Sequence, residues 1–288
     1  MMFKKFIQIC LQIDKKRALL FKRFSRKKDS FFNIPKRQKF IIGVAILSLI
    51  LFFSEQTFGK EGLLYTAILL SIFTGIFVFW AEKSDLEENF SPQIFILPLF
   101  YTLACTLFYF LVPARLITRI GMTSLYAFGL YSLLLSENIF IVSSIRTIAL
   151  LSSARTVSFV VTILSYFFLS NVVFSLHLNI VTTLLFVFIF SLPLILHSVW
   201  THTLNSNFRT HLEWIALIVL CLVETAFALW FWSTTPTIIA LFLTGLFYIL
   251  VGISQVWLDK RLFKGVMWEY IWVAVIVFLV FVTFSLRS

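Results

Sequence analysis

Nine long apolar stretches are the feature that most constrains how this chain can fold. Each reaches or approaches the roughly 20 residues that a helix needs to cross the hydrocarbon core of a bilayer. They cover residues 40–58, 62–81, 93–113, 119–137, 157–176, 179–199, 214–232, 236–257 and 268–286. Tryptophan, which prefers the headgroup zone, lies at or near six of their ends: Trp80, Trp200, Trp214, Trp232, Trp257 and Trp268. We therefore predict an all-α polytopic transmembrane helix bundle of about nine spans.

The composition excludes a water-soluble fold. Hydrophobic residues make up 60% of the chain and charged residues 13%, whereas soluble domains are roughly 45–50% apolar and about 25% charged. Too few polar side chains are present to cover a core in water. The connections between the predicted spans are short, so any activity must come from the helices, their loops or the N-terminal segment.

The whole net charge of +11 lies in the first 39 residues. These hold thirteen Lys or Arg side chains against two acidic ones, while the rest of the chain is balanced. We therefore divide the chain into a basic arm, residues 1–39, and a transmembrane bundle, residues 40–288. The polar and apolar residues of 2–13 fall on different faces of a helix, which predicts an amphipathic helix on anionic membrane lipid. Nucleic acid is the alternative partner, and we favour lipid because the arm adjoins a spanning helix.

The distribution of cations predicts the orientation of the chain. Cationic segments remain on the cytoplasmic side, so the arm places the N-terminus inside and nine crossings place the C-terminus outside. With this threading, twenty Lys and Arg side chains lie inside and four outside. The exception is the loop that carries Arg115 and Arg119, which would suit the inner side better. We expect a protein integral to a cytoplasmic membrane.

Two sets of small residues at helical spacing predict places where helix backbones approach closely. One set is Ala67, Ser71 and Gly75 in the second span, and the other is Gly245 and Gly252 in the eighth. Small residues at such spacing are typical of contacts between transmembrane helices. We interpret both as packing seams and not as functional sites.

The segment 136–158, between the fourth and fifth spans, is the most unusual part of the sequence. Residues 143–147 (SSIRT) return nine residues later as 152–156 (SSART). In a single helix, nine residues correspond to about 900° of rotation, so Arg146 and Arg155 would point to opposite sides. Polar and apolar residues occur all round this helix, so we expect it to pack among the inner ends of the other helices.

Glu137, Arg146 and Arg155 form a candidate site at the cytoplasmic rim. One interpretation is an ion pair or carbonyl contact that ties the loop to the bundle, with Glu137 or Glu213 as the acid. A second is a site for an anionic or polyprenyl-phosphate headgroup, because guanidinium and hydroxyl groups suit phosphate. A third is part of a solute path.

Part of this segment carries a resemblance to known sequences. The residues concerned are Glu137-Asn138-Ile139-Phe140, Ile145-Arg146-Thr147-Ile148, Leu150-Leu151 and Ala154-Arg155. They resemble a segment of uncharacterised multi-pass membrane proteins of small-genome bacteria. Because that group has no assigned activity, the resemblance implies a bacterial membrane protein and transfers no site residue or cofactor.

Glu224 is the candidate intramembrane polar site. It lies well inside the seventh span, about 16 Å from the predicted start at the rise of a helix. A charge at such depth costs at least ~2.5 kcal/mol, so we expect the side chain to face the bundle interior, to be protonated or to have a partner. Two roles for Glu224 remain alternatives. A protonated carboxyl could hold two helices together, or the residue could be a proton or cation site in a transport path.

Three histidines and one glutamate near the sixth and seventh spans form a further polar cluster: His197, His202, His211 and Glu213. Four histidines in the whole chain are too few for a di-iron desaturase. A zinc site from this cluster is conceivable, but no HExxH helix supplies a general base. We predict no metal and no cofactor.

The sequence therefore favours a non-enzymatic integral membrane protein that handles or passes a small solute or lipid through a polar intramembrane site. A membrane scaffold or assembly protein is the alternative from a second class. An enzyme acting on a lipid-linked phosphate is the third, and the chain shows no GxSxG elbow or Gly-rich phosphate loop to support it.

Overall fold

Nine long helices make up the part of the chain that the computed structural model describes, and each is long and apolar enough to cross a membrane. The described residues are 35–58, 62–86, 91–113, 115–143, 149–204, 211–232 and 234–285. No strand occurs among them. The chain divides after Lys39 into two units, and the helices below belong to the second, Phe40–Ser288, apart from the first four residues of α2. Most of the predicted arm, residues 1–34, lies outside the described residues.

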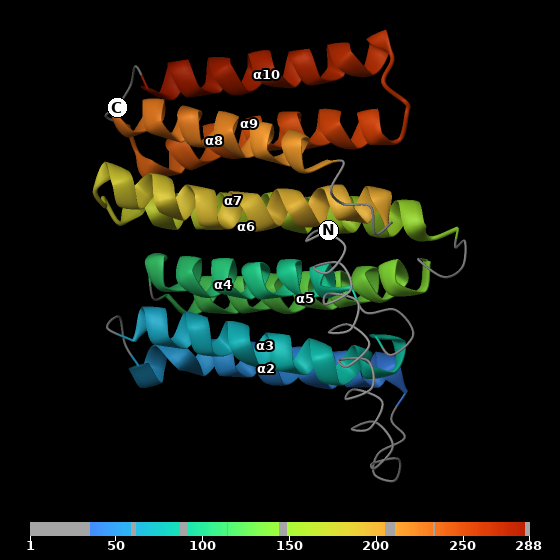
Figure 1. Cartoon of the computed structure of the whole chain (residues 1–288). Coiled ribbons are helices and arrows are strands. Elements are labelled where there is room, and N and C mark those ends of the chain that lie inside the picture. The colour runs from blue at the N-terminus through green and yellow to red at the C-terminus, as the bar shows by residue number, and fades with distance from the viewer. Residues whose placement is uncertain are drawn as a thin grey trace, which may run out of the picture. The chain divides into compact units, whose positions relative to one another are not determined.

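The helices follow one another along the chain with short connections (Figure 1). Their bounds are α2 (Lys36–Phe58), α3 (Leu63–Leu86), α4 (Ile96–Leu111), α5 (Leu116–Ser143), α6 (Leu151–Ser175), α7 (Ile180–Thr203), α8 (Leu212–Trp230), α9 (Pro236–Leu258) and α10 (Lys264–Ser285). A single turn of 3₁₀ helix, η1 (Pro92–Phe95), leads into α4. Each predicted span corresponds to one helix, so the all-α polytopic fold is confirmed.

The helix ends differ from the predicted span ends around the fourth and fifth spans. Helix α5 continues to Ser143 and α6 begins at Leu151, so segment 136–158 consists mainly of the ends of two spanning helices. The case of a single helix across this segment, considered in the sequence analysis, therefore does not apply. Hydropathy ended the spans too early because Glu137 and Arg155 are ionisable, whereas in the fold each finds a partner on another helix.

Helix α6 lies at the centre of the bundle, where it packs against α4, α5, α7 and α9. Its polar residues suit this position because their hydroxyls bond to the helix backbone. Thr162 donates to the carbonyl of Ser158 and Ser165 to that of Val161, each at 2.8 Å. Such bonds satisfy small polar side chains without water. By contrast, α10 packs on α9, and Phe281 is its buried residue.

Both predicted small-residue seams are helix contacts, as expected. Gly245 and Gly252 on α9 face Val277 and Tyr270 of α10, and a Cβ atom at either glycine would come within 2.7 Å of these side chains. On α3, the Ser71 hydroxyl donates to the carbonyl of Leu99 on α4 at 3.0 Å. The missing or small side chains therefore let the paired backbones approach.

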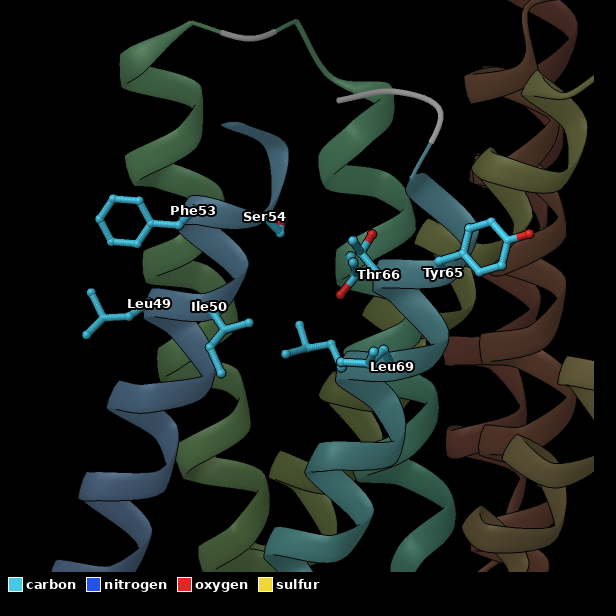
Figure 2. Close-up of a pocket in the computed structure, with 9 residues that line it drawn as sticks. Leu49, Ile50, Phe53, Ser54, Tyr65, Thr66 and Leu69 are labelled. Atoms are coloured by element: carbon cyan, nitrogen blue, oxygen red, sulfur yellow. The ribbon is translucent and has the colours of Figure 1, made fainter. Parts of the chain in front are cut away.

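A groove of about 360 Å³ lies between α2 and α3. Figure 2 shows Ile50 of α2 and Leu69 of α3 projecting toward each other across it. Most other lining side chains are also apolar, and the hydroxyls of Ser54, Thr66 and Thr106 are its polar groups. Charged side chains are missing from this lining, and so are all of the predicted site residues. The groove therefore suits an apolar chain better than a hydrophilic solute.

Candidate functional site

A glutamate and a histidine meet inside the bundle, fully removed from the surface. Glu137 of α5 and His197 of α7 are both 0% exposed, and the Oε1 and Nε2 atoms lie 2.9 Å apart. Each residue lies six positions before the end of its helix, which is about 9 Å of helical rise. The pair is therefore an ionisable contact at membrane depth.

Aromatic side chains cover the pair one turn further along both helices. Phe140 follows Glu137 by three residues and Trp200 follows His197 by three, so in each helix the two side chains share a face. The rings of Phe140 and Trp200 meet edge to face, with centroids 6.2 Å apart and an angle of 82°. Trp200 lies near the end of α7, as the sequence predicts, and its side chain is buried against the other helices. Its packing separates the pair from the ends of the helices.

Each member of the pair keeps a second polar atom that has no hydrogen-bond partner among the described residues. These atoms are Oε2 of Glu137 and Nδ1 of His197, and the side-chain oxygen of the neighbouring Asn138 is in the same state. Buried polar atoms without partners are rare in proteins, because leaving one unpaired costs about 1–3 kcal/mol. A water molecule or a polar group of a solute would satisfy these atoms.

A second polar cluster, which we call the rim cluster, joins α6, α7 and α9 at the ends of these helices. The Arg155 guanidinium donates to the carbonyls of Thr201 and His202, each at 3.1 Å. It also lies 3.5 Å from the Asp259 carboxylate, which is 3.2 Å from Nδ1 of His202. A cation near the last carbonyls of α7 is stabilised by the helix dipole.

The contacts of Arg155 in the rim cluster differ from the predicted ones. Arg155 was expected to pair with Glu137 or Glu213, but it contacts Asp259 and two backbone carbonyls. The expected type of contact, tying this segment to the bundle, is present. Glu137 lies deeper and pairs with His197, while Glu213 is exposed on α8. Arg146 lies outside the described residues.

The predicted histidine cluster does not form one group in the described part of the chain. His197 pairs with Glu137 and His202 with Asp259, in two separate contacts. Three or more His, Cys, Asp or Glu side chains do not gather at metal-ligand spacing anywhere in the described ranges. The two histidines therefore act in acid–base pairs in this fold.

Glu224 is the predicted site residue whose position differs most from expectation. It lies within α8 (Leu212–Trp230), about 18 Å from the first residue and about 9 Å from the last at helical rise. Its side chain is exposed on the outer surface of the helix. Of the three alternatives that the sequence left for Glu224, the one in which it faces the bundle interior does not apply, because the inner face of α8 is occupied by apolar side chains such as Leu222 and Ala226.

A family match covers most of the bundle. Residues 43–284, which include both Glu137 and His197, match the family described as a protein of unknown function (DUF5656). The chain belongs to this family. No curated protein and no solved structure matches it. Membership of DUF5656 thus agrees with the predicted resemblance to uncharacterised proteins, and it assigns no activity to the site.

The pairing of Glu137 with His197 is the feature that sequence reasoning missed in this DUF5656 member. The two residues were singled out separately, as part of a rim site and of a histidine cluster, and 60 positions separate them. One signal was available. With alternating crossings, the ends of the fourth and sixth spans lie on the same side of the membrane, so both residues occupy a similar depth.

Proposed function

We propose that this protein passes or handles a small solute in the membrane, with a proton bound and released at the Glu137–His197 pair. The observation that carries the proposal is the full burial of both side chains at a separation of 2.9 Å. Ionisable groups at membrane depth are costly, and they commonly mark proton or ion pathways. A carboxyl and an imidazole in contact can share, gain or lose a proton while keeping a hydrogen bond.

The rest of the bundle supports a functional role for the pair over a purely structural one. Several other contacts between helices inside the bundle are uncharged, such as Thr102 to Thr74 at 3.2 Å and Gln255 to Ser198 at 2.6 Å. Replacing a buried ionic pair by apolar residues is often neutral or stabilising. Helix contact alone therefore gives no reason for an acid and a base at this position.

The rim cluster supports a path from the pair toward one face of the membrane. It lies at the ends of α6, α7 and α9, and α5 and α7 also end on that side, about 9 Å beyond the pair at helical rise. Arg155, Asp259 and His202 bring both signs of charge to this rim. In this proposal a polar solute is stabilised at the rim, and it reaches the unpaired atoms of Glu137 and His197 when the contact between Phe140 and Trp200 opens.

Lipid is the second candidate for the transported or bound molecule, and the α2–α3 groove favours it. The groove is lined mainly by apolar side chains, among them Leu49 and Phe53, which are exposed at the helix surface. An acyl or polyprenyl chain fits such a lining. In this version of the proposal the groove holds the chain, and the Glu137–His197 pair keeps its proton-exchange role.

The proposal is tested with the full chain in vesicles that contain a pH-sensitive dye. A membrane potential, negative inside, is applied, and proton uptake is followed after adding a mixture of amino acids, nucleosides and sugars or, separately, polyprenyl phosphate. We expect uptake with at least one addition and a decrease of at least tenfold in Glu137→Gln, because glutamine keeps the shape but exchanges no proton. Glu269→Gln, the same change at an exposed site on α10, should retain wild-type uptake.

Two outcomes would contradict the proposal. One is a wild-type protein that takes up no protons with any of these probes. The other is a Glu137→Gln variant that matches the wild type, which would leave the pair with a structural role only.

We further propose that the protein lies in a bacterial cytoplasmic membrane with its N-terminus inside and the basic arm on anionic lipid. The helix order supports this, since Lys83, Arg155, Lys260 and Arg261 share one side and Arg115 lies on the other. Cationic ends remain on the cytoplasmic side. A fluorescent protein fused to the C-terminus should stay dark and alkaline phosphatase fused there should be active; the reverse pattern would refute this orientation.

A further inference from the structure

The outer face of α8 carries the carboxyl group of Glu224 within an apolar stripe, and the exposed Glu213 continues this stripe in the first turn of the helix. The stripe, which we call the α8 seam, consists of Leu217, Leu220, Glu224, Phe227 and Phe231. The four apolar members are 55%, 59%, 48% and 66% exposed. Their spacing alternates between three and four residues, as in the contact face of a helix pair.

Hydrocarbon is a poor environment for the Glu224 side chain. The residue lies about 9 Å inside the end of α8 at helical rise, and among the described residues its carboxyl has no hydrogen bond or ion pair. Ionisable residues within spans almost always face protein or water. The surface around Glu224 is apolar, so protein is the cover that supplies a polar partner.

We propose that the α8 seam is the contact between two copies of this chain, with the two Glu224 carboxyls bonded to each other. All copies insert with the same orientation, so a two-fold axis along the membrane normal brings Glu224 of both to one depth. A protonated carboxyl is both a donor and an acceptor, and it is therefore complementary to a second copy of itself. A different partner would need a matching polar group at that depth, whereas a second copy necessarily has one.

The residues beside Glu224 allow close approach of two such helices. Cys221 and Ala228 lie on either side of it along the helix, and both are small and at least partly exposed. Small residues next to a polar one are typical of associated transmembrane helices. Glu224 is the polar position between Leu217 and Phe231, and it fixes the register because any shift along the axis separates the two Glu224 carboxyls.

The native thiol of Cys221 provides the test, since it lies one turn from Glu224 and is free. Full-length protein carrying Cys10→Ser, in which the other remaining thiol, Cys105, is buried, is treated in phospholipid vesicles with a short, membrane-permeant bismaleimide at decreasing protein-to-lipid ratios. We expect a covalent dimer that disappears in Cys221→Ser. In Glu224→Leu the protein-to-lipid ratio for half dimerisation should rise about tenfold, the effect of ~1–2 kcal/mol of interhelical hydrogen bonding. Glu224→Gln, which still donates and accepts, should dimerise within a few-fold of the wild type.

The controls separate the seam from general effects of the membrane. Glu269→Leu removes an exposed carboxyl from α10 and should leave dimer formation unchanged. A wild-type protein that remains monomeric at high protein-to-lipid ratio would overturn the proposal, as would equal dimerisation of Glu224→Leu. Cross-linking of Cys221 in native membranes to another protein, with no dimer, would also overturn it and assign the seam to a different partner.

Discussion

Replacing Glu137 with Ala should lower the free energy of unfolding by about 3–5 kcal/mol, because it leaves the buried His197 without its partner. Both side chains are 0% exposed, so neither water nor the headgroups compensate for the loss. His197→Ala should have a similar effect by leaving the carboxyl unpaired. The change is measured by equilibrium unfolding in mixed micelles, followed by tryptophan fluorescence.

The double replacement of the pair by apolar residues distinguishes stability from function. With Glu137→Leu and His197→Leu together, no buried polar group is left alone, and the free energy of unfolding should lie within about 1–2 kcal/mol of the wild type. The same variant should take up no protons in vesicles. If it were as unstable as the single variants, packing around Phe140 and Trp200 would account for the loss in all three, and the pair would have no separable ionic contribution.

Replacing Gly129 with Val should also destabilise the bundle strongly, by about 1–3 kcal/mol or more. A Cβ atom at Gly129 on α5 would overlap the hydroxyl end of Tyr101. That ring is held in place, since its hydroxyl donates to the Leu125 carbonyl at 2.8 Å and it stacks on Tyr126 with centroids 5.9 Å apart. Relief of the overlap therefore requires the loss of a buried hydrogen bond or a shift of α4 against α5.

Gly121 on the same helix provides a matched control for Gly129. A Cβ atom at Gly121 meets no heavy atom within 4 Å. Gly121→Ala should therefore be neutral or stabilise the helix by up to about 1 kcal/mol, through its helix propensity. Equal unfolding free energies for Gly129→Val and Gly121→Ala would show that α4 and α5 are not in the close contact described here.

Glu224 shows why a sequence indicates the depth of a residue in the membrane better than the side of the helix that faces the other helices. Glu224 was correctly placed inside a span, because hydropathy and length determine where a helix crosses the bilayer. Which face points inward depends on the neighbouring helices, and α8 turns Leu222 and Ala226 toward them instead. Its outer face is left with an acid that the sequence alone would assign to the interior.

Arg155 shows that the sequence also does not identify the contact partners of a residue. One of the three interpretations drawn from the sequence is that Arg155 has a contact that ties its segment to the bundle, and the structure contains such a contact. Its actual contacts come from the ends of α7 and α9, 46 and 104 positions away along the chain. Spacing within one segment gives no information about helices that meet only after folding.

The sequence by itself determined that the chain forms apolar helices long enough to cross a membrane, nine of them in the described residues, and where small residues let these helices meet, since each follows from local composition and helical period. The Gly245 and Gly252 contact with α10 and the α3 contact at Ser71 are examples. Only the tertiary structure decided that Glu137 meets His197 and that Glu224 faces outward. Those facts depend on the rotation and neighbours of each helix, which are determined by packing among all the helices at once and not by any single stretch of residues.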